Sequence, residues 1–524
     1  MVRSSYPDVE IPAVSIHEFL FGAVEEDRLD AVALIDGVSG ATTSYRQLIG
    51  QIDLFAGALA ARGVGVGTRV GVLCPNIPAF ATVFHGILRA GATATTINSL
   101  YTPDEIANQL TDADASWLVT VSPLLPGAKK AAESLGFDAD HIIVLDGAEG
   151  HPSLPALLGE GHAAPDVSFD PATHLAVLPY SSGTTGRPKG VMLTHRNLIA
   201  NVSQCRSTIS LGDDDRVLAV LPFFHIYGMT VLLNFALRQR AALVTMPRFD
   251  LTEFLRVVQE HRTSWVFIAP PIAVALAKHP VVDQYDLSSV KVIFSGAAPL
   301  DGALASAVEA RLDCTVCQGY GMTETSPVTH AIPADRADID RSSVGMLLAN
   351  TEARLVTEDG SDVEVPSEGA SDPGELLIRG PQVMKGYLNR PDATAEMLDA
   401  DGWLHTGDVA TVTHDGVFRI VDRLKELIKY KGYQVAPAVL EAVLLEHPQI
   451  ADAAVIGAND ADGQEVPKAY VVRQADADLS AEDVMEFVAA HVAPHEKVRM
   501  VEFIDVIPKS SSGKILRKDL RARA

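Results

Sequence analysis

Cysteine is scarce in this sequence, with four residues in a chain of 524. So few thiols do not make the disulfide framework of a small secreted domain, and they fit a reducing compartment. Cys314 and Cys317 share a CxxC spacing, but positions i and i+3 of an extended strand point to opposite faces. We therefore expect core thiols there, with neither a shared metal nor a disulfide.

Basic residues are also in deficit, since 42 Lys and Arg stand against 67 Asp and Glu, a formal net charge of −25. Such a chain lacks the cationic surface that binding to nucleic acid or an anionic membrane requires, so neither is expected as a partner. An anionic ligand would need locally placed lysines. The hydrophobic fraction of 47% is that of a globular protein, and the length predicts two or more domains.

Long uncharged stretches are the third feature in short supply. One run, 217–237, carries no charged residue and is long enough to cross a bilayer. Pro222, His225, Gly228 and Asn234 interrupt it, so we favour a buried strand followed by a core helix and expect no stable membrane insertion. The N-terminal MVRSSYPDVEIPA has no apolar core of the kind a secretory signal needs.

What the sequence does have is alternation of strand and helix patterns. Residues 46–62 carry an amphipathic helical pattern that ends at Gly63, and an apolar strand, a second helix and another strand follow by residue 98. This order predicts a parallel sheet and an α/β fold. Similar strands are expected at 116–121, 141–147, 242–250, 264–271 and 290–300, with helices after the last three.

The pattern changes near residue 340. Strand-like segments at 344–359, 374–380 and 416–423, separated by turns and without helices between them, predict a β-rich subdomain. After Leu424 we expect a helix at 437–446, strands at 452–460 and 468–474, a helix at 481–492 and a polar tail. The fold expected is thus a large α/β N-terminal domain, 1–423, and a small mobile α+β C-terminal domain, 424–524.

The segment YSSGTTGRPKGVMLTHRNL, 180–198, has the composition of a phosphate-binding loop. Its glycines let backbone N–H groups turn towards a ligand, its hydroxyls donate, and Lys189 supplies charge. It is not a Walker loop, because Lys189 lies between Pro188 and Gly190. On composition alone a flexible polar turn fits equally well. The cradle residues are Ser181, Ser182, Gly183, Thr184, Thr185 and Gly186.

Four further motifs follow in order: GYGMTET at 319–325, WLHTGD at 403–408, VDRLKELIKYKGYQVAP at 421–437 and PKSSSGKILRKDL at 508–520. Together with the loop, they resemble the motifs of the adenylate-forming enzymes, which include acyl-CoA ligases, firefly luciferase and the adenylation domains of peptide synthetases. The resemblance covers essentially the whole chain. PFFHIYG, SGAAPL and QGYGMTE make it most similar to the 4-coumarate-CoA ligases, although luciferase shares several of these segments.

The resemblance implies an ATP-dependent ligase. Such enzymes join a carboxylate to the α-phosphate of ATP, which releases pyrophosphate and turns a poor acyl donor into a reactive one, and then transfer the acyl group to coenzyme A. Carboxylate and triphosphate are both anions, so holding them together requires cations and oriented donors. ATP, Mg²⁺ and coenzyme A are the expected cofactors and co-substrates, and a small-molecule carboxylic acid is the expected substrate.

By resemblance, the loop and Lys189 hold the β- and γ-phosphates, Thr323 contacts the α-phosphate, and Glu324 with Thr184 holds Mg²⁺. Asp408 and Arg423 would bind the ribose hydroxyls. The residues expected to frame the adenine are Gly296, Ala297, Ala298, Gln318, Gly319 and Tyr320. On spacing alone, Asp408 would be an ordinary turn residue.

Lys514 is expected to bridge the carboxylate and the α-phosphate during adenylation, although by spacing alone it would be a solvated tail lysine. Family members then rotate the small domain about a hinge, here Lys425, which also belongs to the nucleotide site. Rotation would bring Lys429 and Gln434 to the adenylate. The resemblance assigns coenzyme A to Arg248, Lys431 and Gly432. On charge alone, the lysines at 425–431 would equally be an exposed basic patch.

His225 is expected beside the acid pocket, where it would gate the pocket or orient the carboxylate, unless it is a satisfied core histidine. The other pocket candidates are Tyr227, Val231, Ala297, Ala298, Gly321 and Met322. Small residues at 297 and 298 leave room for a flat ring, so an aromatic acid of the cinnamate or 4-coumarate type is predicted. Gly228 and Val231 replace polar residues of the plant enzymes, which predicts weak recognition of a 4-hydroxyl.

Other activities within the superfamily stay open. They are a medium-chain fatty acyl-CoA ligase, a luciferase-like monooxygenase and an adenylation module that loads an amino acid onto a carrier protein. The last is disfavoured because the HIYGMT run offers no acid for an α-ammonium group. The final ARA is not the SKL peroxisomal address, so a cytoplasmic enzyme is expected. We expect a monomer or a weak homodimer.

Overall fold

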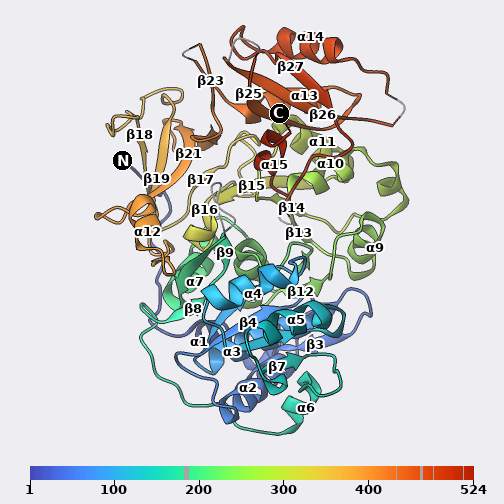
Figure 1. Cartoon of the computed structure of the whole chain (residues 1–524), viewed down its shortest axis with the longest axis vertical. Helices are drawn as coiled ribbons and strands as arrows, with labels where there is room; N and C mark the ends of the chain where they lie inside the picture. Colours follow the sequence, from blue (N-terminus) through green and yellow to red (C-terminus); the bar gives the residue numbers. More distant parts are fainter. Residues whose placement is uncertain (182–187, 432, 461–463, 476, 511–512, 524) are drawn as a thin grey trace.

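The structure is a computed structural model that describes residues 1–181, 188–431, 433–460, 464–475, 477–510 and 513–523. The fold comprises two large sheets, a smaller antiparallel sheet and a C-terminal α+β unit (Figure 1). The predicted mixed α/β architecture is confirmed.

The first large sheet is parallel at its centre, with strand order β20-β10-β8-β5-β4-β6-β7 and β9 paired to β10. Pairing is parallel from β8 to β7 and antiparallel where β10 joins β8. Its strands are β4 (Arg69–Leu73), β5 (Thr93–Thr96), β6 (Trp117–Thr120), β7 (Ile142–Val144), β8 (Leu175–Val177), β9 (Tyr180–Ser181), β10 (Lys189–Thr194) and β20 (Gly386–Tyr387).

The second large sheet has nine strands, ordered β17-β16-β15-β14-β13-β11-β12-β2-β3. Its strands run parallel from β15 to β2, so their carboxyl ends meet at one edge. They are β2 (Val32–Asp36), β3 (Thr42–Ser44), β11 (Arg216–Ala219), β12 (Ala242–Thr245), β13 (Trp265–Ile268), β14 (Val292–Ser295), β15 (Thr315–Gly321), β16 (Val328–Ala331) and β17 (Met346–Leu347).

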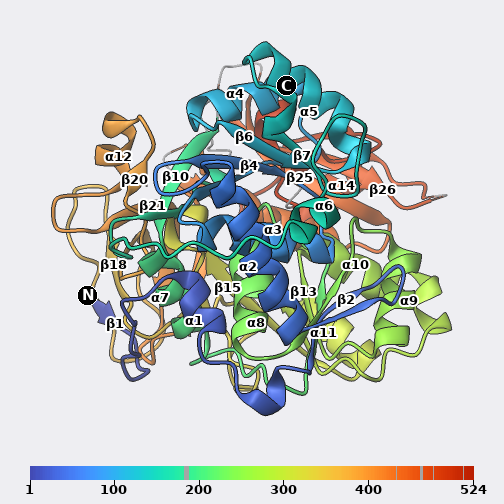
Figure 2. The ribbon, with the colours of Figure 1, turned by 90° about the horizontal axis from the view of Figure 1, so that it is seen from below.

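Helices cover and separate these sheets. They are α1 (Ile16–Phe21), α2 (Tyr45–Ala61), α3 (Pro78–Arg89), α4 (Pro103–Asp112), α5 (Leu125–Ser134), α6 (Leu154–Gly159), α7 (His195–Cys205), α8 (Ala236–Arg238), α9 (Leu251–His261), α10 (Pro270–Lys278) and α11 (Gly302–Leu312). Figure 2 shows α2 and α3 between the strands of the two sheets, and one hydrophobic cluster joins them to both sheets.

Helix α2 illustrates how the sequence produces these elements. Ser44 and Gln47 form a capping box that satisfies backbone N–H groups at its first turn. Its predicted apolar face, including Leu48, Ile52 and Phe55, is fully buried. Burial of such a face, more than helix propensity, stabilises a helix of this length. The helix predicted at 46–62 is therefore confirmed with its boundary shifted by one residue.

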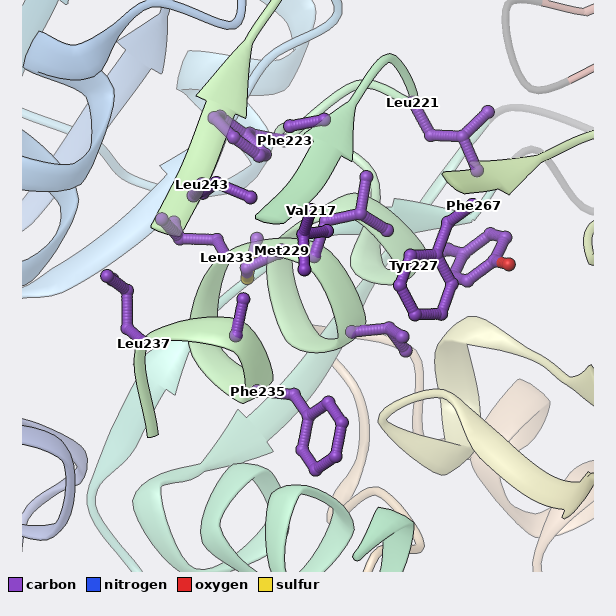
Figure 3. Close-up of a cluster of buried hydrophobic side chains, with 14 of the residues drawn as sticks. Val217, Leu221, Phe223, Tyr227, Met229, Leu233, Phe235, Leu237, Leu243 and Phe267 are labelled. Atoms are coloured by element: carbon purple, nitrogen blue, oxygen red, sulfur yellow. The ribbon is translucent and has the colours of Figure 1, made fainter. Parts of the chain in front are cut away.

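The uncharged run 217–237 folds as predicted, as a buried strand followed by a buried helix. The helix is a π-helix, η4 (Gly228–Phe235), which continues into α8. Figure 3 shows Met229 and Leu233 of this helix packed among the side chains of β11 and β12. A Cβ on Gly228 would lie 2.1 Å from the carbonyl oxygen of Pro222, so this close approach requires glycine. Among the described residues, no helix has the length and apolarity to cross a membrane.

The predicted β-rich segment forms an antiparallel sheet, ordered β1-β18-β19-β21-β22. Its strands are β1 (Val2–Arg3), β18 (Glu352–Val356), β19 (Gly374–Arg379), β21 (Leu404–Val412) and β22 (Phe418–Arg423). The prediction that no helix intervenes was wrong, because α12 (Pro391–Met397) lies between β19 and β21. Pro391 fixes the first-turn φ of this short helix, a signal that the sequence does contain.

The last hundred residues hold their own hydrophobic clusters. The helices predicted at 437–446 and 481–492 are confirmed as α13 (Pro437–Glu446) and α14 (Ala481–His491). The strands here are β23 (Ile428–Tyr430), β24 (Tyr433–Val435), β25 (Ile450–Asn459), β26 (Glu465–Arg473) and β27 (Met500–Phe503). The prediction of a polar tail was incomplete, because β27 pairs in parallel with β26 and α15 (Arg517–Arg521) buries Leu520.

The cysteines agree with expectation in that all four are free thiols. Cys317 is buried and Cys314 is half-buried. Within the described ranges, no group of three or more His, Cys, Asp or Glu side chains is arranged to hold a metal ion. The CxxC spacing therefore belongs to the core of the second sheet, because Cys317 lies within β15.

Buried histidines couple this core to pH. His85 of α3 is 0% exposed, and neither of its ring nitrogens has a hydrogen-bond partner among the residues that the structure describes. It packs against the rings of Phe21 and Phe84. Burial lowers the pKa of His85 to about 3, and burial followed by repulsion from Arg89 lowers that of nearby His17 to about 4. Between pH 6.5 and these lowered pKa values, the two histidines bind protons in the unfolded chain but not in the folded chain. The free energy of unfolding therefore decreases as the pH falls.

Replacing His85 should weaken this pH dependence. His85→Leu keeps a similar volume and removes one titrating group, so the free energy of unfolding should fall less steeply below pH 6.5, by about 1.4 kcal/mol per pH unit. Thermal unfolding of wild type and variant from pH 7 to pH 5 measures this difference. His414→Leu, at an exposed ring, is the control and should leave the slope unchanged. Parallel curves for wild type and His85→Leu would contradict the assignment.

Candidate functional site

Residues from four of the sequence motifs lie within one narrow region of the molecule, around a cavity at the carboxyl ends of β14 and β15. The cavity has a volume of about 40 Å³, enough for a few water molecules. Carboxyl ends of parallel strands are the usual location of ligand sites in α/β sheets. The lining residues are His225, Ile226, Tyr227, Phe294, Gly296, Ala297, Gly319, Tyr320, Gly321, Met322, Thr323, Pro327, Val328 and Lys514.

Glycine makes the close walls of this cavity possible. A Cβ on Gly296 would lie 2.7 Å from the ring of Tyr227, and one on Gly321 would lie 2.1 Å from the carbonyl oxygen of Pro327. Side chains cannot occupy these positions without moving a ring or the backbone. Ala297 has a φ of +72°, a conformation that L residues seldom adopt. The cavity therefore has flat walls of backbone and aromatic ring.

Lys514 reaches the cavity from the C-terminal segment. The N–H of Gly513 donates to the carbonyl of Ser510 over 2.9 Å, with Gly513 at a φ of +84°. A Cβ on Gly513 would lie 3.2 Å from Cβ of Ala269, so Gly513 packs against the residue that follows β13. The pKa of Lys514 is lowered, first by burial and then by Arg423, while Asp408 and Glu324 oppose the shift.

Asp408 and Arg423 form a charged pair beside Lys514. The antiparallel register of β21 and β22 places them opposite each other, with Asp408 Oδ1 3.1 Å from Arg423 Nε. The second oxygen of Asp408 accepts a hydrogen bond of 2.5 Å from the Tyr320 hydroxyl, and the residue is 4% exposed. Burial disfavours the charged form of Arg423. The negative charge of Asp408, added to that of other acidic groups, has the larger effect and raises the pKa of Arg423.

Glu324 lies on the other side of the site in a short 3₁₀ turn, η6 (Thr323–Thr325). It is 4% exposed, and its Oε1 accepts a hydrogen bond of 2.7 Å from the hydroxyl of Tyr387. The Lys189 ammonium lies 4.9 Å from the centre of the same tyrosine ring. Sequence reasoning missed Tyr387, whose only signal is the MKGYLN segment between the recognised motifs.

His225 enters the cavity from the loop before η4. Its Nδ1 accepts a hydrogen bond of 3.4 Å from the backbone N–H of Tyr227. Burial, then the positive charge of Lys514, lowers the pKa of His225 to about 3, so the ring is neutral at physiological pH. The Tyr227 hydroxyl donates to the carbonyl oxygen of Phe294 over 3.2 Å. A neutral imidazole can orient a carboxylate by donating from Nε2 without adding charge.

Several predicted residues do not line the cavity. Val231 is fully buried within η4, and the amide of Gln318 is engaged with Leu300 and with the carbonyl of Arg341. Ala298 follows the lining residues directly and is itself outside the lining. Ser181 ends β9 and pairs with Lys189. Six further predicted residues lie outside the part of the chain that the structure describes: Ser182, Gly183, Thr184, Thr185, Gly186 and Gly432.

The residues predicted for the second half of the reaction are at the surface. Their side chains are exposed, and the residues are Lys425, Lys429, Lys431, Gln434 and Arg248. Gln434 Nε2 donates to Glu358 Oε1 over 3.1 Å, which connects the β23–β24 hairpin to the antiparallel sheet. In this arrangement Lys514 is at the cavity and Lys429 is not.

A second, larger cavity of about 530 Å³ carries none of the predicted residues. Its charged side chains include Arg28, Arg206, Arg238 and Arg240, together with three acidic residues. Arg28 pairs with Asp213, and Arg240 is bound by several carbonyls and pairs with Glu25. The motifs identify the smaller cavity as the candidate site.

Comparisons with known proteins agree with this choice. The family model described as "AMP-binding enzyme" matches residues 21–388, and "AMP-binding enzyme C-terminal domain" matches residues 439–514. A 4-coumarate–CoA ligase of Oryza sativa subsp. japonica is 41% identical over 99% of this chain and 97% of its own. A 4-coumarate–CoA ligase of Pinus taeda is 42% identical over 100% of this chain and 97% of its own.

Among solved structures, the anthranilate CoA ligase AuaEII in complex with anthranoyl-AMP is similar over 98% of both chains. The TM-score is 0.90 at 25% identity.

The charges around Lys514 predict that its pKa shifts in opposite directions in two variants. Asp408→Asn removes a charge that favours the ammonium form, so it should lower the pKa of Lys514, and Arg423→Gln should raise it. The pH dependence of Lys514 acetylation by acetic anhydride, followed by peptide mass spectrometry, measures both. The exposed Lys518 in the same digest is the internal control. Shifts of the same sign in both variants would refute this account of the site.

Proposed function

The chain belongs to the AMP-binding enzyme family, and from this premise we propose that it activates an aromatic carboxylic acid as its acyl-adenylate and transfers the acyl group to coenzyme A. The observation that carries the proposal is the position of Lys514, whose ammonium shares one cavity with His225 and lies beside Asp408 and Arg423. Relatives along the full chain are named as acid–CoA ligases, which are AMP-forming acid–thiol ligases.

In the first half-reaction a carboxylate oxygen attacks the α-phosphorus of ATP, and the bond to the bridging oxygen breaks as pyrophosphate leaves. Negative charge accumulates at the α-phosphate, where Lys514 and the N–H and hydroxyl of Thr323 would stabilise it. Asp408 and Arg423 would hold the ribose hydroxyls, since a carboxylate accepts and a guanidinium donates in fixed geometry. Lys189 and the loop that starts at Ser181 would hold the outer phosphates.

Glu324 fits the proposed Mg²⁺ ion. Its carboxylate is almost fully buried, accepts a hydrogen bond from Tyr387 and has no salt bridge within the described part of the chain, and a bound cation would stabilise such a carboxylate further. Carboxylate oxygen is the ligand type that Mg²⁺ prefers. When bound, Mg²⁺ would neutralise phosphate charge. Thr184, the other proposed ligand, lies outside the described residues.

The second half-reaction requires a thiol to reach the adenylate carbonyl. We infer that residues 424–524 form a small domain that turns about Lys425, withdrawing Lys514 and bringing Lys429 and Gln434 to the adenylate. The exposed positions of Lys429 and Gln434 support this, because side chains outside the cavity in one arrangement are free to enter it in another. Arg248 and Lys431 would then meet the phosphates of coenzyme A.

An aromatic substrate is supported by the flat cavity walls and by the names of the relatives, which include 4-coumarate and anthranilate ligases. Gly228 and Val231 offer no polar side-chain group to a 4-hydroxyl, so we propose that cinnamate is used as well as 4-coumarate. We further propose a cytoplasmic enzyme that is a monomer or weak homodimer.

A panel of aromatic and aliphatic acids tests the function directly. AMP release that depends on both acid and coenzyme A, with cinnamate and 4-coumarate within about tenfold of each other, is the expected result. A medium-chain fatty acid as the best substrate would favour the fatty acyl ligase. Oxygen consumption with the adenylate would favour a monooxygenase, and no AMP with any acid would refute the ligase.

Lys514→Ala should slow adenylation by on the order of 100-fold, because one charge-stabilising donor is lost. Thioester formation from supplied acyl-adenylate should persist. Acid-dependent exchange of pyrophosphate into ATP measures the first step, and acyl-CoA production from the adenylate measures the second. Lys518→Ala, four residues along at an exposed position, is the matched control. Unchanged pyrophosphate exchange would exclude the role given to Lys514.

Lys429→Ala should have the opposite effect. Adenylate should form at nearly the wild-type rate and accumulate, while acyl-CoA output falls roughly tenfold or more because the second arrangement is impaired. Quenched reactions analysed for both products measure the two steps. Lys130→Ala, another exposed lysine, is the control. Equal loss of both steps would remove the support for two arrangements.

A further inference from the structure

Tyr387 stands between the two charged groups that the proposed function assigns to the ATP phosphates and the metal. It lies on β20, which pairs with β10 so that Tyr387 is opposite Val191. The N–H of Leu388 donates to the carbonyl of Gly190 over 2.8 Å, which continues this pairing towards Lys189. Strand pairing therefore fixes Tyr387 beside the lysine that begins β10.

The same short strand is fixed to the turn that carries Glu324. The N–H of Met384 donates to the carbonyl of Glu324 over 2.8 Å, and the Tyr387 hydroxyl donates to Glu324 Oε1 over 2.7 Å. Tyr387 is 5% exposed. Burial, then the charge of Glu324, raises its pKa, so the hydroxyl keeps its proton and remains a donor.

A lysine and a glutamate that lie near one another attract each other, and more strongly where water is largely excluded. A direct pair between Lys189 and Glu324 would neutralise both, so that neither could bind a charged ligand. No such ion pair exists among the residues that the structure describes. Instead the ring of Tyr387 holds the lysine and its hydroxyl holds the carboxylate.

We propose that Tyr387 is a positioning residue that keeps Lys189 and Glu324 apart and aimed at the site, so that the lysine stays available for phosphate and the carboxylate for the metal. The two halves of the side chain have separate tasks. The hydroxyl orients Glu324, and the ring separates Lys189 from it through a cation–π contact. This inference rests on the proposed function, because it assumes that the site binds metal–ATP.

Two substitutions separate these tasks. Tyr387→Phe keeps the ring and removes the hydroxyl, and Tyr387→Leu removes both. Tyr45→Phe is the matched control, because it also removes a buried hydroxyl, which donates to the carbonyl of Ala241 over 3.0 Å, in a part of the molecule to which no role in binding is assigned. Thermal unfolding of each variant checks that the fold is kept.

Binding is measured by isothermal titration calorimetry with ATP in EDTA and with ATP and Mn²⁺, and Mn²⁺ occupancy by electron paramagnetic resonance. In Tyr387→Phe, the gain in ATP affinity that Mn²⁺ provides should fall by about tenfold, the order expected for one hydrogen bond to a charged group. Metal-free ATP binding should stay within about twofold of wild type, as should both measurements for Tyr45→Phe.

Tyr387→Leu should also weaken metal-free ATP binding, because Lys189 can then pair with Glu324. Adding Glu324→Gln to this variant removes the competing carboxylate and should restore metal-free binding towards the wild-type value. A merely structural tyrosine would not give this rescue, since a second core substitution would not repair a packing defect.

The outcomes distinguish this proposal from the function on which it rests. Wild-type protein that binds no ATP, or gains nothing from Mn²⁺, would overturn both. Wild-type binding as expected, with Tyr387→Phe equal to wild type in the metal-dependent gain, would overturn the positioning role alone. Failure of Glu324→Gln to rescue Tyr387→Leu would overturn the separating role of the ring.

Discussion

A positive charge, that of Lys514, lies in a cavity walled by aromatic rings and bare backbone, and the other charged groups of the site are arranged around it. Burial and Arg423 disfavour the ammonium form, while Asp408 and Glu324 favour it. In a poorly hydrated site these Coulomb terms are strong, and no group can be changed without altering the others. A lysine balanced in this way is well suited to meet an anion that brings its own negative charge, such as a carboxylate beside a phosphate.

The balance depends on a few long-range backbone pairings. The register of β21 and β22 sets Asp408 opposite Arg423, and β20 connects β10 to the turn that carries Glu324. Glycines let these segments approach closely, as at Gly321 and Gly513. Charged side chains are therefore held by sheets and tight turns, and Lys514 follows Gly513, which packs close to Ala269 of the larger body.

The acidic surface and the local cations together explain how the chain can bind anionic ligands selectively. A net charge of −25 repels polyanions in general, while in the proposed function Lys189, Arg423 and Lys514 would attract an anion that fits the site. The role proposed for Tyr387 implies that opposite charges within such a site must be kept from pairing with each other. The exposed Lys429 and Gln434 lie outside this arrangement, as the proposed adenylation step requires.

The sequence by itself determined the alternation of strands and helices, the capped helix α2, the buried run 217–237 and the order of the five motifs. These are local signals, since periodicity and capping act within a few residues. It did not reveal α12 as an interruption of the β-rich sheet, the strand and helix within the C-terminal tail, or Tyr387. Which segments meet was decided only by the tertiary structure, because Lys189, Glu324 and Tyr387 come together through strand register, and register depends on pairing partners far away in the chain.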